Sequence, residues 1–203
     1  DSSFAPAYAL IGQEYRKDAE YQKALDYTKK AMTLEPENVS YKSIFGSILY
    51  QMGEFKMALP YLEEIVSNRP WEYKAHFQLG RTLIKLGQTE QGQWHLSQAD
   101  SLRTLQSKII QLQYKAMQNP DSLMLWVDLG ESFYRLGHLE QARDVLEVAL
   151  SLEPDNPALQ NNLASLLAET GDLPGAISRY WDILAQDPTI SDIWFNLGAA
   201  YVH

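Results

Sequence analysis

Apolar residues recur along the 203-residue chain at spacings of three and four, which predicts helices with one buried face. This pattern repeats about every 34 residues around a small residue, with an apolar residue one position before it and another three positions after it. The small residues are Gly12, Gly46, Gly80, Gly130, Ala164 and Gly198. A period of this length is typical of a solenoid, in which one supersecondary unit is stacked on the next.

Each repeat is expected to contain two antiparallel helices. The first helix of four units is followed by a glycine suited to a left-handed cap, at Gly53, Gly87, Gly137 and Gly171. The second helix of four units is closed by a proline that cannot continue it, at Pro36, Pro70, Pro154 and Pro188. A second column of small residues, twelve positions after the first, contains Ala24, Ala58, Gly92, Ala142 and Ala176. The two columns predict where the paired helices touch, because a larger side chain would push them apart.

The complete units span residues 5–38, 39–72, 73–106, 123–156 and 157–190, and a half unit spans 191–203. We therefore expect one all-α solenoid over 1–203. Residues 107–122 belong to no complete unit. No glycine or proline occurs from Gln93 to Gln118, and an apolar stripe runs through this segment, which predicts one extended helix at about 89–118. The alternative is a break near Ser107 with a separate helix before Pro120.

The repeat resembles the tetratricopeptide repeat family, whose pattern is Trp-x-x-Leu-Gly-x-x-Tyr, then Ala-x-x-x-Phe, then Pro. Trp194, Leu197, Gly198 and Tyr201 match its first part in full. The resemblance implies a right-handed superhelix whose concave wall is formed by the first helix of each unit. It also implies that this wall binds a peptide or a partner protein.

Counting from the small residue of each unit gives the candidate partner-binding residues of this wall. They are Ile44, Phe77, Gln78, Arg81, Asp128, Glu131, Asn161, Asn162 and Asn196. A carboxamide both donates and accepts hydrogen bonds, so spaced asparagines suit the backbone of an extended peptide. Asn162 and Asn196 resemble part of the asparagine ladder of the O-linked N-acetylglucosamine transferase repeats.

Family members that bind chaperone tails hold two carboxylates with Lys and Asn residues of this wall. Here Ala9, Gln13 and Ile44 stand in those columns, and only Lys74 matches. We therefore predict that the chain does not bind an acidic chaperone C-terminus.

Charge separates the two halves of the chain, whose net charge is −9. Residues 1–106 sum to −1 and residues 107–203 to −8. An acidic surface repels phosphate backbones, so we expect no nucleic-acid partner, and the acidic half is suited to steer a basic one. No run approaches the roughly 18 apolar residues of a membrane span, so we expect no membrane insertion.

The sequence gives no support for chemistry at a site. There is no cysteine, and the four histidines, His76, His95, His138 and His203, show no metal-ligand spacing. Gly87 and Gly92 have the spacing of a phosphate loop, but Gln93 and Trp94 stand in place of its Lys-Ser/Thr. We expect a non-catalytic interaction scaffold with no cofactor and no metal.

Two alternatives remain open. The first is a self-associating structural module that uses the long helix or the C-terminal helix, whose apolar face contains Trp194, Leu197 and Tyr201. The second is a recruiting arm of a larger enzyme. The half unit caps the array, pairs with another copy or continues into further sequence; we favour the last, which makes the chain a segment of a longer protein.

Overall fold

The computed structural model describes residues 4–202, and within them every regular element is an α-helix. The chain divides into two compact units, Asp1–Thr104 and Leu105–His203. The first unit contains α1 (Ala5–Lys17), α2 (Tyr21–Leu34), α3 (Val39–Met52), α4 (Phe55–Asn68), α5 (Tyr73–Lys85) and the beginning of α6 (Thr89–Gln118). The second contains the end of α6, α7 (Leu123–Arg135), α8 (Leu139–Leu152), α9 (Pro157–Glu169), α10 (Leu173–Gln186) and α11 (Ser191–Val202).

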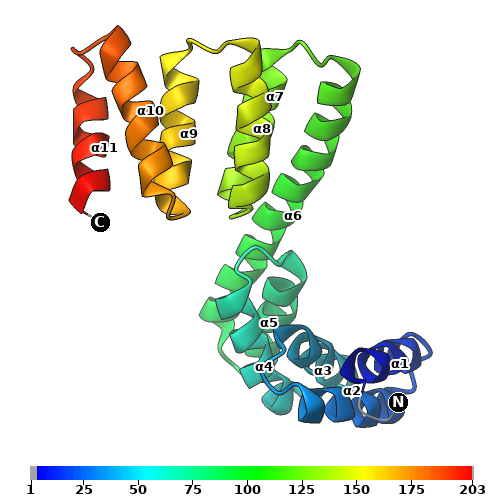
Figure 1. The fold of residues 1–203 in the computed structure, drawn as a ribbon. Coiled ribbons are helices and arrows are strands. Elements are labelled where there is room, and N and C mark those ends of the chain that lie inside the picture. The colour runs from blue at the N-terminus through cyan, green and yellow to red at the C-terminus, as the bar shows by residue number, and fades with distance from the viewer. Residues whose placement is uncertain (1–3, 203) are drawn as a thin grey trace. The chain divides into compact units, whose positions relative to one another are not determined.

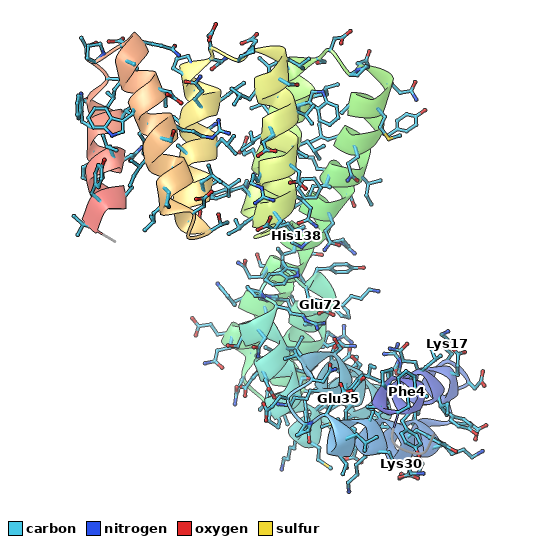
Figure 2. All side chains as sticks on the ribbon, viewed as in Figure 1. Phe4, Lys17, Lys30, Glu35, Glu72 and His138 are labelled. Carbon is cyan, nitrogen blue, oxygen red and sulfur yellow. The ribbon has the colours of Figure 1, made fainter. Side chains whose placement is uncertain are left out.

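Helices that follow one another in the chain pack side by side within each unit (Figure 1). In the first unit α1 packs on α2 and α3 on α4, and the first helices also approach each other, α1 with α3 and α3 with α5. In the second unit α7 pairs with α8 and α9 with α10, and α11 packs on α10. Charged side chains such as Lys17 and Lys30 project from the surface of the first unit (Figure 2). None of the described helices combines the length and hydropathy that crossing a membrane requires.

The segment around residue 107 is a single helix, α6, of 30 residues. The extended helix is therefore confirmed, and the alternative break near Ser107 is absent from this part of the described chain. Within the second unit, Ile109, Leu112 and Ala116 of α6 are buried. We retain the division of the chain into repeats as a proposal.

Small residues lie where the paired helices approach most closely, as predicted. A Cβ atom added to Gly80 of α5 would lie 2.7 Å from the carbonyl oxygen of Gly92 in α6, and one added to Gly92 would lie 2.6 Å from that of Gly80. In α7, a Cβ on Gly130 would lie 2.9 Å from Cδ2 of Leu146. Real Cβ atoms do not approach other atoms so closely, so the backbones of α5 and α6 can meet at Gly80 and Gly92 only because both residues lack a side chain, and Gly130 leaves room for the Leu146 side chain.

The four glycines predicted to cap first helices are left-handed, with φ of 79° at Gly53, 86° at Gly87, 78° at Gly137 and 90° at Gly171. In the first repeat, Ala19 stands 34 residues before Gly53 and has φ of 58°. It is the one residue other than glycine with positive φ in the described chain. The turn thus forces the same conformation on a residue with a Cβ atom, at a steric cost.

A side chain near the start of several first helices bonds back to the turn before it. Trp126 and Trp194 donate from Nε1 to the carbonyl oxygens of Pro120 and Pro188, at 2.7 and 2.9 Å. Gln160 Nε2 donates to Pro154 O at 2.7 Å, and His76 Nε2 lies 3.1 Å from Pro70 O. Each pair spans six residues, so Pro120 after the extended helix has the same role as the prolines that close ordinary units.

Gly80→Ala should destabilise the chain by about 1–3 kcal/mol, because the new methyl group overlaps the backbone of α6. Gly198→Ala is the matched control in the same sequence column, since a Cβ there meets no atom within 4 Å. The control should be neutral or stabilising by up to about 1 kcal/mol, because alanine has the better helix propensity. Urea unfolding of both variants measures the difference; equal effects would contradict the close helix contact.

Ala19→Gly should raise the free energy of unfolding by roughly 0.5–1 kcal/mol. The relief of left-handed strain exceeds the extra chain entropy that glycine brings to the unfolded state. Gly53→Ala at the equivalent turn should change stability in the opposite sense, and thermal melts of the two variants test the pair. A loss of stability in Ala19→Gly would show that the turn is not strained.

Candidate partner-binding groove

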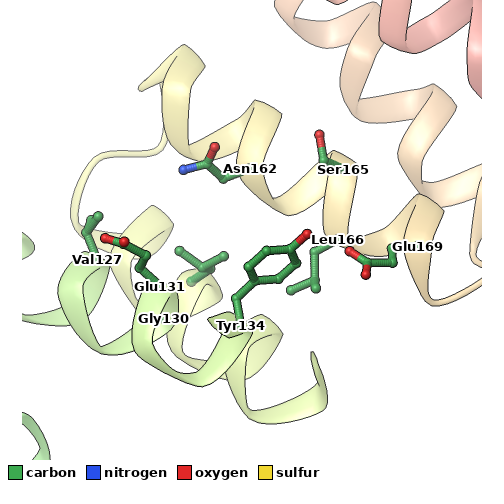
Figure 3. Close-up of a pocket in the computed structure, with 9 residues that line it drawn as sticks. Val127, Gly130, Glu131, Tyr134, Asn162, Ser165, Leu166 and Glu169 are labelled. Atoms are coloured by element: carbon green, nitrogen blue, oxygen red, sulfur yellow. The ribbon is translucent and has the colours of Figure 1, made fainter. Parts of the chain in front are cut away.

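The second unit contains a cavity of about 380 Å3 between α7 and α9 (Figure 3). It is lined by Val127, Gly130, Glu131, Tyr134, Leu146, Asn162, Ser165, Leu166 and Glu169. A neighbouring cavity of about 300 Å3 lies between α9, α10 and α11. It is lined by Ser165, Ala168, Glu169, Leu173, Tyr180, Asn196, Ala199 and Ala200. Ser165 and Glu169 of α9 line both cavities, which are therefore adjacent; together they are named the α7–α9–α11 groove.

The spacing of the first helices explains why the hollow is largest between α7 and α9. Cα atoms of α9 and α11 approach within 8 Å, whereas those described for α7 and α9 do not. Tyr134 of α7 and Leu166 of α9 lie in the gap (Figure 3). The groove thus has aromatic and aliphatic surface at its centre and polar groups around it.

Polar groups of the groove form bonds across neighbouring helices. Asn196 Nδ2 donates to Asn161 Oδ1 at 3.2 Å, which connects α11 to α9. The hydroxyl groups of Ser165 and Tyr180 lie 3.2 Å apart, which connects α9 to α10. A hydrogen bond to the Glu169 carboxylate, and the negative charge of that group, raise the pKa of Tyr134. Tyr134 therefore stays protonated and donates to Glu169 at neutral pH.

Several of the wall residues predicted in the second unit come together here. Glu131 and Asn162 line the larger cavity and Asn196 lines the smaller one. Asn161 is half-buried beside Asn196, as its hydrogen bond shows. Asp128 is half-buried one turn before Glu131 on α7 and does not line either cavity.

The wall residues predicted in the first unit divide into two kinds. Phe77 and Arg81 of α5 are exposed, and Gln78 Oε1 accepts a hydrogen bond from Ser47 Oγ of α3 at 3.0 Å. Ile44 is buried in a core cluster with Ala5, Ala9 and Ile48. Its side chain packs between helices, so the structure removes Ile44 from the candidate binding surface.

The apolar residues expected to promote self-association make contacts inside the second unit, and Trp194 and Tyr201 remain 46% and 62% exposed. Leu197 is 3% exposed and belongs to the core, which removes it from any free surface. Trp194 packs edge-on against Trp181 of α10, with ring centroids 5.6 Å apart. Tyr201 accepts a hydrogen bond from Trp181 Nε1 at 3.2 Å. This face of α11 therefore serves to hold α11 on α10.

Two polar residues of the larger cavity escaped the sequence analysis, Tyr134 and Glu169. A signal for them existed, because Glu131 and Tyr134 are three residues apart, and Asn162, Ser165 and Glu169 follow one another at three and four. These spacings place them on one helix face. Extending the predicted columns by one more turn would have found the pair formed by Tyr134 and Glu169.

A second polar cluster lies in the first unit, outside this groove. His76 of α5 and His95 of α6 have their Nδ1 atoms 3.0 Å apart, and Trp94 stacks edge-on against His95. Burial lowers the pKa of His76, and burial together with the neighbouring His76 lowers the pKa of His95. Both rings are therefore neutral at pH 7. His203, the last histidine of the sequence, lies outside the described residues.

Acidification should destabilise the chain through His76. Because its folded pKa lies below the ordinary value of about 6.5, the unfolded chain binds a proton that the folded chain does not. The stability that depends on neutral His76 is fully present above the unfolded pKa of about 6.5. It is lost as the pH falls from there toward the lower pKa of the folded chain. We expect urea unfolding at pH 7.5 and pH 5.5 to show the loss.

His76→Gln is the matched variant, because Gln160 at the equivalent position makes the same bond to a proline carbonyl. It should unfold with a weaker dependence on pH than the unmodified chain. An unchanged dependence would mean that His76 does not titrate in this range.

Comparison with known proteins identifies relatives of the repeat. The family model described as tetratricopeptide repeat matches residues 5–38 and 127–189. The BBSome complex member BBS4 homolog of Drosophila melanogaster is 25% identical over 96% of this chain and 46% of its own length. The human DnaJ homolog subfamily C member 7 is 24% identical over 96% of this chain and 38% of its own length. The human Protein O-mannosyl-transferase TMTC3 is 24% identical over 85% of this chain and 19% of its own length.

The chain thus spans less than half the length of these relatives. Among solved structures, a thermophilic tetratricopeptide repeat protein of Thermus thermophilus is 22% identical, with a TM-score of 0.41. That similarity covers 98% of this chain and 100% of the other.

Proposed function

The chain belongs to the tetratricopeptide repeat family, and from this premise we propose that it binds an extended segment of a partner protein in the α7–α9–α11 groove. A protein-interaction module built as a helical solenoid is what the family match supports. Binding of the partner segment in the groove is the more specific part of the proposal. We propose further that the chain has no catalytic role and does not bind nucleic acid, given its net charge of −9.

The observation that carries the proposal is that two adjacent cavities lie along three first helices. The two cavities share Ser165 and Glu169, and each has a carboxamide on its wall, Asn162 in one and Asn196 in the other. Carboxamides offer both a donor and an acceptor, so they can bond to the backbone of an extended peptide whatever its side chains. The exposed ring of Tyr134 and the half-buried side chain of Val127 give such a segment apolar surface to bury.

A recruiting arm within a larger protein is the second candidate. It is favoured by the similarity of this chain to a segment that makes up 19% of a protein named as a transferase. The same groove would then hold the protein that the larger molecule acts on. This candidate changes the setting of the binding site and leaves its chemistry the same.

Asn162→Ala/Asn196→Ala should weaken the binding of peptides selected on the unmodified chain from a displayed library of random segments of about twelve residues. Losing two neutral hydrogen bonds should cost about 1–3 kcal/mol, which lowers affinity by roughly 5- to 150-fold. Fluorescence anisotropy with labelled peptides measures the change.

The matched control is Gln141→Ala/Gln186→Ala, which removes two carboxamides from exposed positions on the second helices α8 and α10. It should leave affinity unchanged. Equal affinity of the groove double variant and the unmodified chain would contradict the proposal. If no peptide is selected and light scattering shows a mass of two chains, the result would favour the self-associating structural alternative.

A further inference from the structure

Two carboxylates project from opposite walls of the larger cavity. Glu131 comes from α7 and Glu169 from α9, and both are exposed (Figure 3). In the described chain no Lys, Arg or His nitrogen lies within 4.0 Å of either carboxylate. The bond from Tyr134 positions the Glu169 carboxylate but does not neutralise it.

Some other carboxylates of this chain are paired with cations. Lys42 Nζ lies 2.7 Å from Glu64 Oε1, and Arg143 lies 2.6 Å from Glu140 Oε2 on α8. Ion pairs at exposed positions contribute little to stability, so the chain loses little stability by leaving the carboxylates of the groove without a cation. The two carboxylates provide acceptors on the walls of the cavity, and Glu169 already accepts one hydrogen bond, from Tyr134.

The electrostatic surroundings add to the attraction for a cation. The second unit carries 5 Lys or Arg residues against 13 Asp or Glu residues. Charges of one sign that line a concave surface concentrate the electrostatic field inside it. An acidic segment entering the groove would meet repulsion from both walls.

The apolar part of the groove fits the remainder of a long basic side chain. Val127, Leu166 and the ring of Tyr134 line the same cavity as the two carboxylates. Lysine and arginine bury their methylene stems along apolar surface while the charged head remains among polar groups. A guanidinium group also stacks on an aromatic face such as that of Tyr134.

We infer that the α7–α9–α11 groove selects a basic segment of a partner protein, with lysine or arginine side chains paired with Glu131 at one end of the larger cavity or with Glu169 at the other (Figure 3). The inference rests on the proposed function, because it names the chemistry of the segment that the groove binds. The carboxamides at Asn162 and Asn196 hold the backbone of the segment, and the carboxylates choose its side chain.

The test uses a positional library of peptides about ten residues long, with both ends capped so that only side chains carry charge. Binding to the 203-residue chain is measured by fluorescence anisotropy at low and at physiological salt. We expect lysine or arginine to be enriched at one or two positions. Replacing the enriched residues with glutamine in the best peptide should weaken binding about tenfold or more at low salt, and with glutamate further still.

Glu131→Gln/Glu169→Gln should reduce this preference for the basic peptide over its glutamine version to less than about threefold. The matched control, Glu140→Gln/Glu147→Gln, removes the same total charge from exposed positions on α8 and should keep the preference. Circular dichroism melts establish that both variants are folded.

The outcomes separate the two proposals. Peptides that bind in the groove, as shown by loss in Asn162→Ala/Asn196→Ala, but prefer neutral or acidic residues would overturn the basic specificity and leave the proposed function standing. A basic preference that survives Glu131→Gln/Glu169→Gln would also overturn it, since overall charge would then be the cause. If the affinity of the peptides is unchanged in every groove variant, both the proposed function and the basic specificity would be overturned.

Discussion

The close approach of two helix backbones within each pair is the constraint from which the rest of the arrangement follows. At Gly80 and Gly92 each α-carbon lies against the carbonyl of the other helix, with no room for a methyl group. Such contact fixes the angle and the register of a pair, because sliding one helix along the other would bring a larger side chain into the gap. When pairs of equal register are stacked, their first helices present equivalent faces side by side. The groove of the second unit is lined by those faces of α7, α9 and α11.

The sequence analysis succeeded wherever steric necessity restricts the residue type. Small residues at helix contacts and glycines at left-handed turns have few substitutes, so their spacing predicts the helix pairs. Even here Ala19 shows that a turn can impose its conformation on a residue that does not favour it. The continuous helix α6 was predictable for the complementary reason, since Gln93 to Gln118 contains no residue that would interrupt it.

Exposure was harder to predict, because it depends on what the neighbouring helix contributes. Ser47 and Glu131 stand in the same sequence column, yet Ser47 is 8% exposed and Glu131 is exposed. Gln78 from the next helix covers Ser47, whereas the wider gap between α7 and α9 leaves Glu131 open. Ile44 was assigned to a surface from its column position and Leu197 from its place on an apolar helix face, and both proved to be core residues. The distance to the next helix decides whether these side chains are exposed, and the residue pattern of a single helix does not contain that distance.

The bond from the start of a first helix to the proline carbonyl six residues earlier has a consequence for how repeats are exchanged. It lies wholly within one turn and the helix that follows, and it forms with tryptophan, glutamine or histidine as the partner. A turn and the helix that follows it thus form a unit that contains both partners of the bond. When the crossover between repeats falls inside a second helix, both partners of this bond come from the same parent repeat; when it falls after the proline, they come from two different repeats. Duplication, deletion and grafting of units should therefore tolerate the former junction, in natural evolution and in engineered chimaeras alike.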